Sequence, residues 1–375
     1  MKLGVLIGGS DAPGLNAVIR AVVRTAVFRY RSDVVGVSHG FEGLLRPPEV
    51  WPLGPGDVRG LSRRGGAILG SCNRGSPFSS EGRDRSDEVL ETVRWMGIDA
   101  LVCVGGDGSL AIADRLHRLG VPIVGIPKTV ENDLDGTGVT FGYSTAVEIA
   151  CEAIDKLQTT RETQHRVMYI EVVGRRAGWI ALSAGIAGAA DVILIPEIPY
   201  RVDAIAEVVR ERAAQGKPST IVVVAEGARE VGGAPAYEDP GVRRQGGVAS
   251  SLAARVEALC QADYRVTVLG HLQRGGAPNA QDRILATRFG AAAVKAAHEG
   301  RSGQMVGIAG SEIVHVPLDR AVGTIKAVDP QSELVWTAVS VGTSFGVPVE
   351  ELAALPRPAQ APVAAGPAAG GRAGP

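Results

Sequence analysis

Apolar runs that end in glycine-rich loops recur along this chain, and they constrain its fold more than any other feature. KLGVLI, DALVCV and RVMYIEVV are each followed by glycines and then by apolar residues at helical spacing, which predicts strand, loop and helix. The runs are continuous rather than alternating, as in parallel strands that helices cover on both faces. Ligands of such sheets bind beyond the carboxyl ends of the strands, where these loops lie. The sequence therefore predicts an α/β fold with one or two clefts lined by glycine-rich loops.

Length and charge narrow the classes of protein further. The 375 residues are enough for two domains, and the net charge of −1 provides no basic field that would attract nucleic acid. No run of about 18 apolar residues occurs, so we expect no transmembrane helix and no membrane partner. The four cysteines are far apart and lack metal-ligand spacing, which favours free thiols in the cytoplasm. The Pro- and Ala-rich end, residues 353–375, predicts a disordered tail.

The segment VGGDGSLAIAD is the strongest phosphate-binding candidate. Bare glycines let backbone N–H groups approach phosphate oxygens, and the start of the following helix adds partial positive charge. Asp107 stands at this turn and can hold Mg²⁺, which prefers oxygen ligands. GGSDAPG, at Gly8–Gly14, is a weaker loop of the same kind. Either loop alone is compatible with a simple strand-to-helix turn, but the two together favour a nucleotide or another polyphosphate.

The segment GIPKTVENDLDGTG places Lys128 close to Glu131, Asp133 and Asp135, directly after an apolar run. Phosphoryl transfer to an alcohol needs a carboxylate that accepts the hydroxyl proton, a cation that balances phosphate charge, and a metal. This segment offers the base and the cation, although any one of its charges is also compatible with a surface loop. Asp135 is expected to be a solvated loop charge or a turn residue.

Several arginines stand near the ends of two further apolar runs. Arginine forks pair bidentately with phosphate, so a group of them near glycines predicts a clamp for a sugar phosphate. A lone arginine at a strand end is more often a surface ion pair, and the histidine of this group fits a core position equally well. The clamp candidates are Arg166, Arg175, Arg176, Arg265, His271 and Arg274.

Taken in order, these motifs resemble those of the 6-phosphofructokinases. GVLIGGSDAPGLNAVIR, GGDGS, PKTVENDLDGT, EVVGRRAGW and VLGHLQRGGAPNAQDRILATRFG follow one another at the family's rough spacing, over about Leu3–Val341. The resemblance implies two doubly wound α/β domains with mainly parallel sheets. It also implies transfer of a phosphoryl group from ATP, or in some branches from pyrophosphate, to the 1-hydroxyl of fructose 6-phosphate in glycolysis.

A donor site around the glycine loops is implied by this resemblance. Asp107 matches the family's Mg²⁺ and phosphate residue. Ser10 stands where the family has a second glycine and adds a hydroxyl against the donor phosphate, while the family's arginine motif is displaced by one residue. The implied donor-binding residues are Gly9, Ser10, Asn73, Arg74, Gly106, Asp107, Gly108 and Ser109.

Catalysis and sugar binding are implied for the later motifs. Glu131 stands where the family has its base, usually Asp, and a displacement of ~1 Å at such a group can cost about 100-fold in rate. Lys128, Thr129 and Arg175 complete the implied catalytic group. Arg166 and Arg265 would reach the sugar phosphate from a neighbouring subunit, whereas His271 and Arg274 would bind it from the same one. The implied substrate-binding residues are Thr129, Glu131, Arg166, Val173, Gly174, Arg175, Glu226, Arg265, His271 and Arg274.

A site shared between subunits implies a homo-oligomer, a tetramer or a dimer. Arg20 and Arg24 lie one turn apart on the first helix, where some family members bind effectors, but exposed helix arginines with partners four residues away explain them equally well. The implied domains are a donor-binding domain of 1–142 plus about 272–322 and a fructose-6-phosphate-binding domain of 143–271 plus about 323–352.

Two positions point to different phosphoryl donors. Gly108 matches ATP users, because the Asp that pyrophosphate users carry there would clash with the α-phosphate. Lys128 is typical of pyrophosphate users. Steric exclusion is the harder constraint, so we favour ATP over a pyrophosphate-dependent, reversible enzyme. A non-catalytic subunit that binds sugar phosphate is a second alternative, supported by Ser10 and Glu131. An NAD kinase is disfavoured by the arginine segments.

Overall fold

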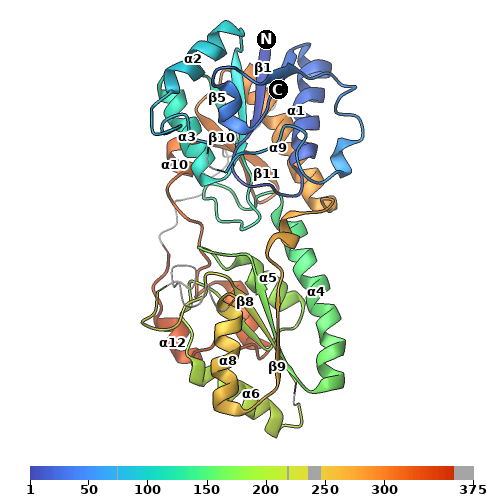
Figure 1. Cartoon of the computed structure of the whole chain (residues 1–375), viewed down its shortest axis with the longest axis vertical. Helices are drawn as coiled ribbons and strands as arrows, with labels where there is room; N and C mark the ends of the chain where they lie inside the picture. Colours follow the sequence, from blue (N-terminus) through green and yellow to red (C-terminus); the bar gives the residue numbers. More distant parts are fainter. Residues whose placement is uncertain (74, 218, 235–245, 359–375) are drawn as a thin grey trace, which may run out of the picture.

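The computed structural model describes residues 1–73, 75–217, 219–234 and 246–358. These residues form two lobes, each built around one sheet (Figure 1). The strands of the first lobe are β1 (Lys2–Ile7), β2 (Asp33–Val37), β3 (Val50–Pro52), β4 (Ala100–Gly105), β5 (Ile123–Pro127), β10 (Gln304–Ala309) and β11 (Glu312–Pro317). Their order is β11-β10-β5-β4-β1-β2-β3, with parallel pairing in the centre. The outer strands β3 and β11 pair antiparallel with their neighbours.

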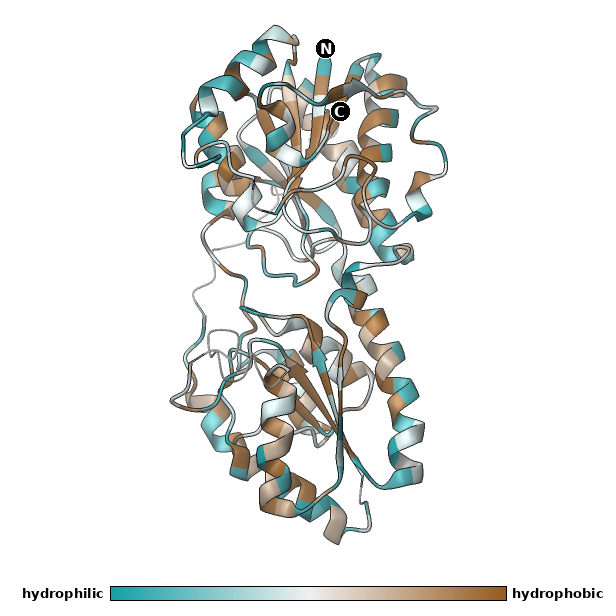
Figure 2. Cartoon of the chain, in the orientation of Figure 1, coloured by the Kyte–Doolittle hydropathy of each residue, from teal (hydrophilic) through white to brown (hydrophobic). Residues whose placement is uncertain are grey.

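Helices cover both faces of this first sheet, which explains its continuous apolar strands. The helical segments are α1 (Leu15–Tyr30), η1 (Gly40–Leu44), η2 (Leu61–Arg63), α2 (Ser86–Trp95), α3 (Asp107–Arg118), α9 (Ala280–His298) and α10 (Leu318–Ala321). Val102 and Val104 of β4 pack into the cluster beneath α1 and α9, whereas Leu101 and Cys103 point to the opposite cluster beneath α2 and α3. Figure 2 shows the apolar interior and the more polar outer helix faces.

The second lobe repeats this plan on a smaller scale. Its strands are β6 (Val167–Val172), β7 (Val192–Leu194), β8 (Thr220–Ala225) and β9 (Tyr264–Val268). They pair in the order β7-β8-β6-β9 and are all parallel. Its helices are α4 (Tyr143–Gln164), α5 (Trp179–Ala187), α6 (Val202–Ala214), α8 (Val248–Cys260), α11 (Glu333–Ser340) and α12 (Val349–Ala354). Ile170 of β6 packs on the α4 and α5 side, and Tyr169 packs on the α6 and α8 side.

The chain passes between the lobes before α4, through η3 (Gly270–Arg274) ahead of α9, and between α10 and α11. The first two crossings are tied together, because Asp282 of α9 accepts hydrogen bonds from the N–H and the hydroxyl of Thr145 of α4, at 2.8 and 2.5 Å. Asn279 caps α9 by accepting the N–H of Asp282 at 3.0 Å. The lobes are therefore joined by several ordered segments.

The predicted α/β fold with two mainly parallel sheets is confirmed. The predicted tail begins too early, because α12 continues to Ala354, and residues 359–375 lie outside the described residues. Among the residues that the structure describes, no helix is both long and apolar enough to cross a membrane. The four cysteines are free thiols.

Candidate active site

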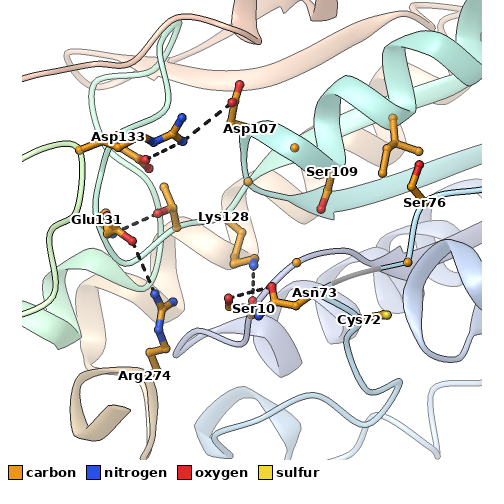
Figure 3. Close-up of a pocket in the computed structure, with 17 residues that line it drawn as sticks. Ser10, Cys72, Asn73, Ser76, Asp107, Ser109, Lys128, Glu131, Asp133 and Arg274 are labelled. Carbon is orange, nitrogen blue, oxygen red and sulfur yellow. Dashed lines mark hydrogen bonds and ion pairs between the residues drawn. The ribbon is translucent and has the colours of Figure 1, made fainter. Parts of the chain in front are cut away.

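A cavity of about 380 Å³ opens where the loops after β1, β4 and β5 meet residues of the second lobe (Figure 3). The predicted residues that it brings together are Gly9, Ser10, Asn73, Gly106, Asp107, Gly108, Ser109, Lys128, Thr129, Glu131, Asp133, Arg176 and Arg274. Its lining is completed by Cys72, Gly75, Ser76 and Ile112. One cavity thus holds the donor loops and the expected base.

The start of α3 forms one wall of the cavity. The helix begins at Asp107 after Gly106, and the N–H groups of its first turn have no acceptor within the helix, which makes this end suited to an anion. A Cβ added at Gly108 would meet no heavy atom within 4 Å, so the space beside this residue is open to a donor. Gly9 stands opposite with a φ of 77°, in the left-handed region that favours glycine.

Ser10, Asn73 and Lys128 form a connected group on the other wall (Figure 3). The Ser10 hydroxyl donates to Asn73 Oδ1 at 2.9 Å, and the Ser10 carbonyl accepts a hydrogen bond from Lys128 Nζ. Burial, helped by the charge of Arg274, lowers the pKa of Lys128 to about 8. Ser10 was expected to direct its hydroxyl against the donor phosphate, but that hydroxyl is engaged by Asn73. Arg74 lies outside the described residues.

Glu131 is held by hydrogen bonds from both sides. Its N–H donates to Thr129 Oγ1 at 3.0 Å, and its Oε2 accepts the backbone N–H of Arg175 at 3.0 Å. Its Oε1 lies 3.5 Å from the guanidinium of Arg274. Burial, and secondly the charge of Asp133, raise the pKa of Glu131 above the usual range of glutamate. A buried carboxylate with a raised pKa is the kind of group that acts as a general base near neutral pH.

Arg176 bridges two carboxylates across the cavity. Its Nη2 lies 3.5 Å from Asp133 Oδ2 and 3.9 Å from Asp107 Oδ2, although Arg176 comes from the loop after β6 of the second lobe. It was expected only as one member of the arginine clamp. Asp135 is buried and accepts the N–H of Gly136 at 2.7 Å, so it is a turn residue rather than a solvated charge.

The other predicted sugar-phosphate residues lie at the carboxyl ends of β6, β8 and β9. The N–H of Val173 donates to the buried Gln273 at 2.8 Å, and Gly174 follows with a φ of 155°. The guanidinium of Arg175 is exposed and lies 3.3 Å from the Glu226 carboxylate. These residues and the exposed His271 of η3 do not line the cavity itself.

Arg166 and Arg265 do not join Arg274 in a clamp within one chain. Arg166 precedes β6 and Arg265 lies near the start of β9, where both guanidiniums pair with Asp263. The site lies beyond the other end of these parallel strands, about 20 Å away at ~3.3 Å per residue. The sequence already indicated that these arginines lie at the far end of the sheet, since both stand before their apolar runs rather than after them.

No role was predicted from the sequence for three residues that support the site. Gln273 accepts the N–H of Val173, and Lys326 donates to Asn132, the residue between Glu131 and Asp133. Lys326 lies in GTIKAVD, which has no glycine-loop pattern, and only the three-dimensional structure places it near the site. Asn132 carried a weak signal, because asparagine tolerates left-handed backbone. Arg24 stacks on Phe28 of α1, with Cζ 4.6 Å from the ring centre, and an effector role for it stays a prediction.

A family model described as phosphofructokinase matches residues 2–297. The ATP-dependent 6-phosphofructokinase of Chloroflexus aggregans is 50% identical over 350 residues, which make up 92% of this chain and 98% of that protein. A solved structure of phosphofructokinase from Saccharomyces cerevisiae matches with a TM-score of 0.75 and 34% identity, over 85% of this chain but only 44% of that longer chain. A pyrophosphate-dependent phosphofructokinase from Marinobacter aquaeolei, with a TM-score of 0.77 and 23% identity over 96% of this chain and 92% of that one, shares the fold.

Proposed function

The chain belongs to the phosphofructokinase family, and we propose that it transfers the terminal phosphoryl group of ATP to the 1-hydroxyl of fructose 6-phosphate, giving fructose 1,6-bisphosphate. The observation that carries this activity is the single cavity in which Glu131 faces the Asp107–Ser109 turn. The names of the similar curated proteins favour ATP over pyrophosphate as donor. The open space beside Gly108 supports the same choice.

In this reaction the sugar O1 forms a bond to the terminal phosphorus while the bond from that phosphorus to the ADP oxygen breaks. Glu131 accepts the proton of the 1-hydroxyl, and the N–H of Arg175 and the guanidinium of Arg274 hold its carboxylate in place. Lys128 and the first-turn N–H groups of α3 face the transferring phosphoryl group and balance its charge. The protein contributes mainly positioning and fixed positive charge.

We propose Asp107 as the protein ligand of a Mg²⁺ ion that arrives on the ATP phosphates. Asp107 and Asp133 offer hard carboxylate oxygens, which fit Mg²⁺, and Mg²⁺ is commonly bound through one or two carboxylates plus substrate phosphates. When bound, the ion would neutralise charge on the donor phosphates. Arg176, which lies between these two carboxylates, would have to yield part of its contact to the metal.

We further propose a homo-oligomer in which Arg166 and Arg265 of one subunit reach the sugar phosphate bound by the next. Their place at the amino ends of β6 and β9 supports this, because it removes them from the site of their own chain. A cytoplasmic location is supported by the free thiols and by the activity itself.

The test is formation of fructose 1,6-bisphosphate from fructose 6-phosphate and Mg²⁺, with ATP and pyrophosphate compared as donors. We expect turnover with ATP and little or none with pyrophosphate. Turnover with pyrophosphate alone would mean that Lys128 decides the donor. Binding of fructose 6-phosphate without turnover from either donor would mean that the chain is a non-catalytic member of the family.

A further inference from the structure

Residues 323–328, which we call the strap, run past the cavity between α10 and α11 and contact both lobes. The N–H of Gly323 donates to Asp107 Oδ1 at 2.8 Å, on the donor side. At the other end, the N–H of Val328 donates to the partly buried Glu197 at 2.7 Å, within the second lobe. The strap therefore connects the donor loop of one lobe with the framework of the other.

Lys326 in the middle of the strap binds the loop that carries the expected base. Its Nζ donates to Asn132 Oδ1 at 2.8 Å and to the carbonyls of Thr137 and Gly138 at 3.0 and 2.9 Å. Its backbone N–H donates to the carbonyl of Asp133 at 3.0 Å. An ammonium has three protons to donate, and here each has an acceptor. A largely buried ammonium is tolerated only when it is satisfied in this way.

Asn132 is the residue through which Lys326 reaches the site. Its φ is 53°, a left-handed conformation that asparagine adopts more readily than most residues. Its Oδ1 also accepts the N–H of Thr140 at 3.1 Å, so two donors hold the side chain. Because Asn132 stands between Glu131 and Asp133, its turn sets the direction of both carboxylates that line the cavity.

We propose that Lys326 is a positioning residue for phosphoryl transfer: by holding the Asn132 side chain it fixes the turn that presents Glu131 to the sugar hydroxyl. This inference rests on the proposed function, since it takes Glu131 as the base. The second lobe supports the lysine, because Trp179 Nε1 donates to the Lys326 carbonyl at 2.7 Å and the Trp179 ring centre lies 5.8 Å from Nζ. Movement between the lobes would therefore change the position of Glu131.

The test compares Lys326→Met, Asn132→Gly and the double variant with the parent protein. Methionine keeps the unbranched stem but removes the ammonium, and glycine keeps the left-handed turn but removes the amide oxygen. Lys295→Met is the matched control, because Lys295 is exposed on α9 and its ammonium lies 3.7 Å from Glu299 of the same helix end. The readouts are kcat, the KM values for ATP and fructose 6-phosphate, and the thermal midpoint.

We expect Lys326→Met to lower kcat by about 30- to 100-fold, the cost of misplacing a reacting group by ~1 Å, while both KM values stay within about threefold. Asn132→Gly should lower kcat similarly, and the double variant should be no worse than the more affected single variant, since both remove one connection. Lys295→Met should retain the parent kcat.

Parent-like kcat in Lys326→Met would overturn the proposal, as would additive losses in the double variant or a loss seen only in KM. Should Lys326→Met fail to fold, Asn132→Gly provides the test, because Lys326 keeps its two carbonyl acceptors in that variant. An unchanged kcat in Asn132→Gly would contradict the proposal. Absence of turnover in the parent protein would instead count against the proposed function.

Discussion

The charged side chains that the first lobe presents after β5 are buried, whereas the second lobe presents arginines that remain partly in solvent. Lys128 is 4% exposed and Asp133 is 8% exposed, and both lie on the segment that follows β5. The side chains of Arg175 and Arg176, on the loop after β6, are 63% and 48% exposed. The donor half is therefore fixed before ligands bind, while the sugar half still has side chains to order.

This contrast has an energetic consequence. Backbone N–H groups and buried charges that are already in place stabilise a transition state without reorganising at the moment of reaction. Ordering an exposed long side chain on binding costs about 0.5–1.5 kcal/mol each. We therefore expect changes in the first lobe to act mainly on kcat and donor choice, and changes in the second lobe to act mainly on the KM for the sugar phosphate.

The largest effect is expected at Glu131, where the lobes meet. Glu131→Gln keeps the shape but cannot accept the proton, so kcat should fall about 10³-fold while both substrates still bind, as measured by turnover and equilibrium binding. Glu131→Asp retracts the carboxylate from Arg175 and Arg274 and should lose about 10- to 100-fold. Near-parent turnover in Glu131→Gln would show that another group is the base.

Gly108 tests whether the donor half selects the phosphoryl donor by the space that it leaves open. Gly108→Asp places a carboxylate in open space within the cavity, so the fold should be retained while turnover with ATP drops about 100-fold through lost fit and charge repulsion. Gly108→Ala adds only a methyl group and serves as the control, with a loss below about tenfold expected. Equal losses of ATP binding and pyrophosphate binding in Gly108→Asp, measured at equilibrium, would argue against a donor-selective role.

Arg166 tests whether the sugar half is completed by another subunit. Arg166→Ala should raise the KM for fructose 6-phosphate about tenfold or more, the usual scale for a charged hydrogen bond to phosphate, with kcat less affected. Mixing Arg166→Ala with the inactive Glu131→Gln should restore activity at low sugar phosphate, because mixed oligomers contain sites with both native residues. If the mixture is no more active than the same amount of Arg166→Ala protein alone, the result would count against a shared site.

The smallest effect is expected from a change of pH. It distinguishes the two halves, because Lys128 of the first lobe titrates in the accessible pH range whereas the arginines of the second lobe stay charged. The folded-state pKa of Lys128 is lowered to about 8, so raising the pH through this value removes the ammonium that faces the donor phosphates. We expect kcat/KM for ATP to fall several-fold above that pH. The raised pKa of Glu131 predicts a second decline on the acid side, as the base becomes protonated.

Two variants show which lysine causes this fall in kcat/KM at alkaline pH, which we call the alkaline limb. Lys128→Met should have a lower rate that no longer declines near pH 8. Lys326 also has its pKa lowered to about 8 by burial, but Lys326→Met should keep the limb, because Lys326 does not line the cavity. A limb that persists in Lys128→Met and disappears in Lys326→Met would reverse this assignment.

Much of the site was predictable because its residues follow apolar strands immediately. Asp107 and Lys128 come within two residues of the ends of β4 and β5, and parallel strands bring such positions to one edge. Glu131 and Arg274 were candidates from their charge and position near apolar runs, and the family motifs added their specific roles. Local sequence and global fold agree at these positions.

The remaining features depend on contacts between distant segments. The strap binds mainly through backbone groups, which any sequence provides, and Lys326 resembles a surface lysine until the fold buries it. The hairpin of β10 and β11 that ends the first sheet has no glycine-rich loop leading into a helix. Ser10 and Asn73 meet across 63 residues, so their hydrogen bond could not be read from either motif.

The interleaved order of the two sheets bears on synthesis at the ribosome. The first sheet lacks β10 and β11, and α1 lacks its partner α9, until the whole second sheet has been made. We expect the smaller lobe to complete its strands first during translation, while the edge of β5 waits for its neighbour. The nascent chain should therefore gain its activity only near the end of synthesis, after the strap has left the exit tunnel.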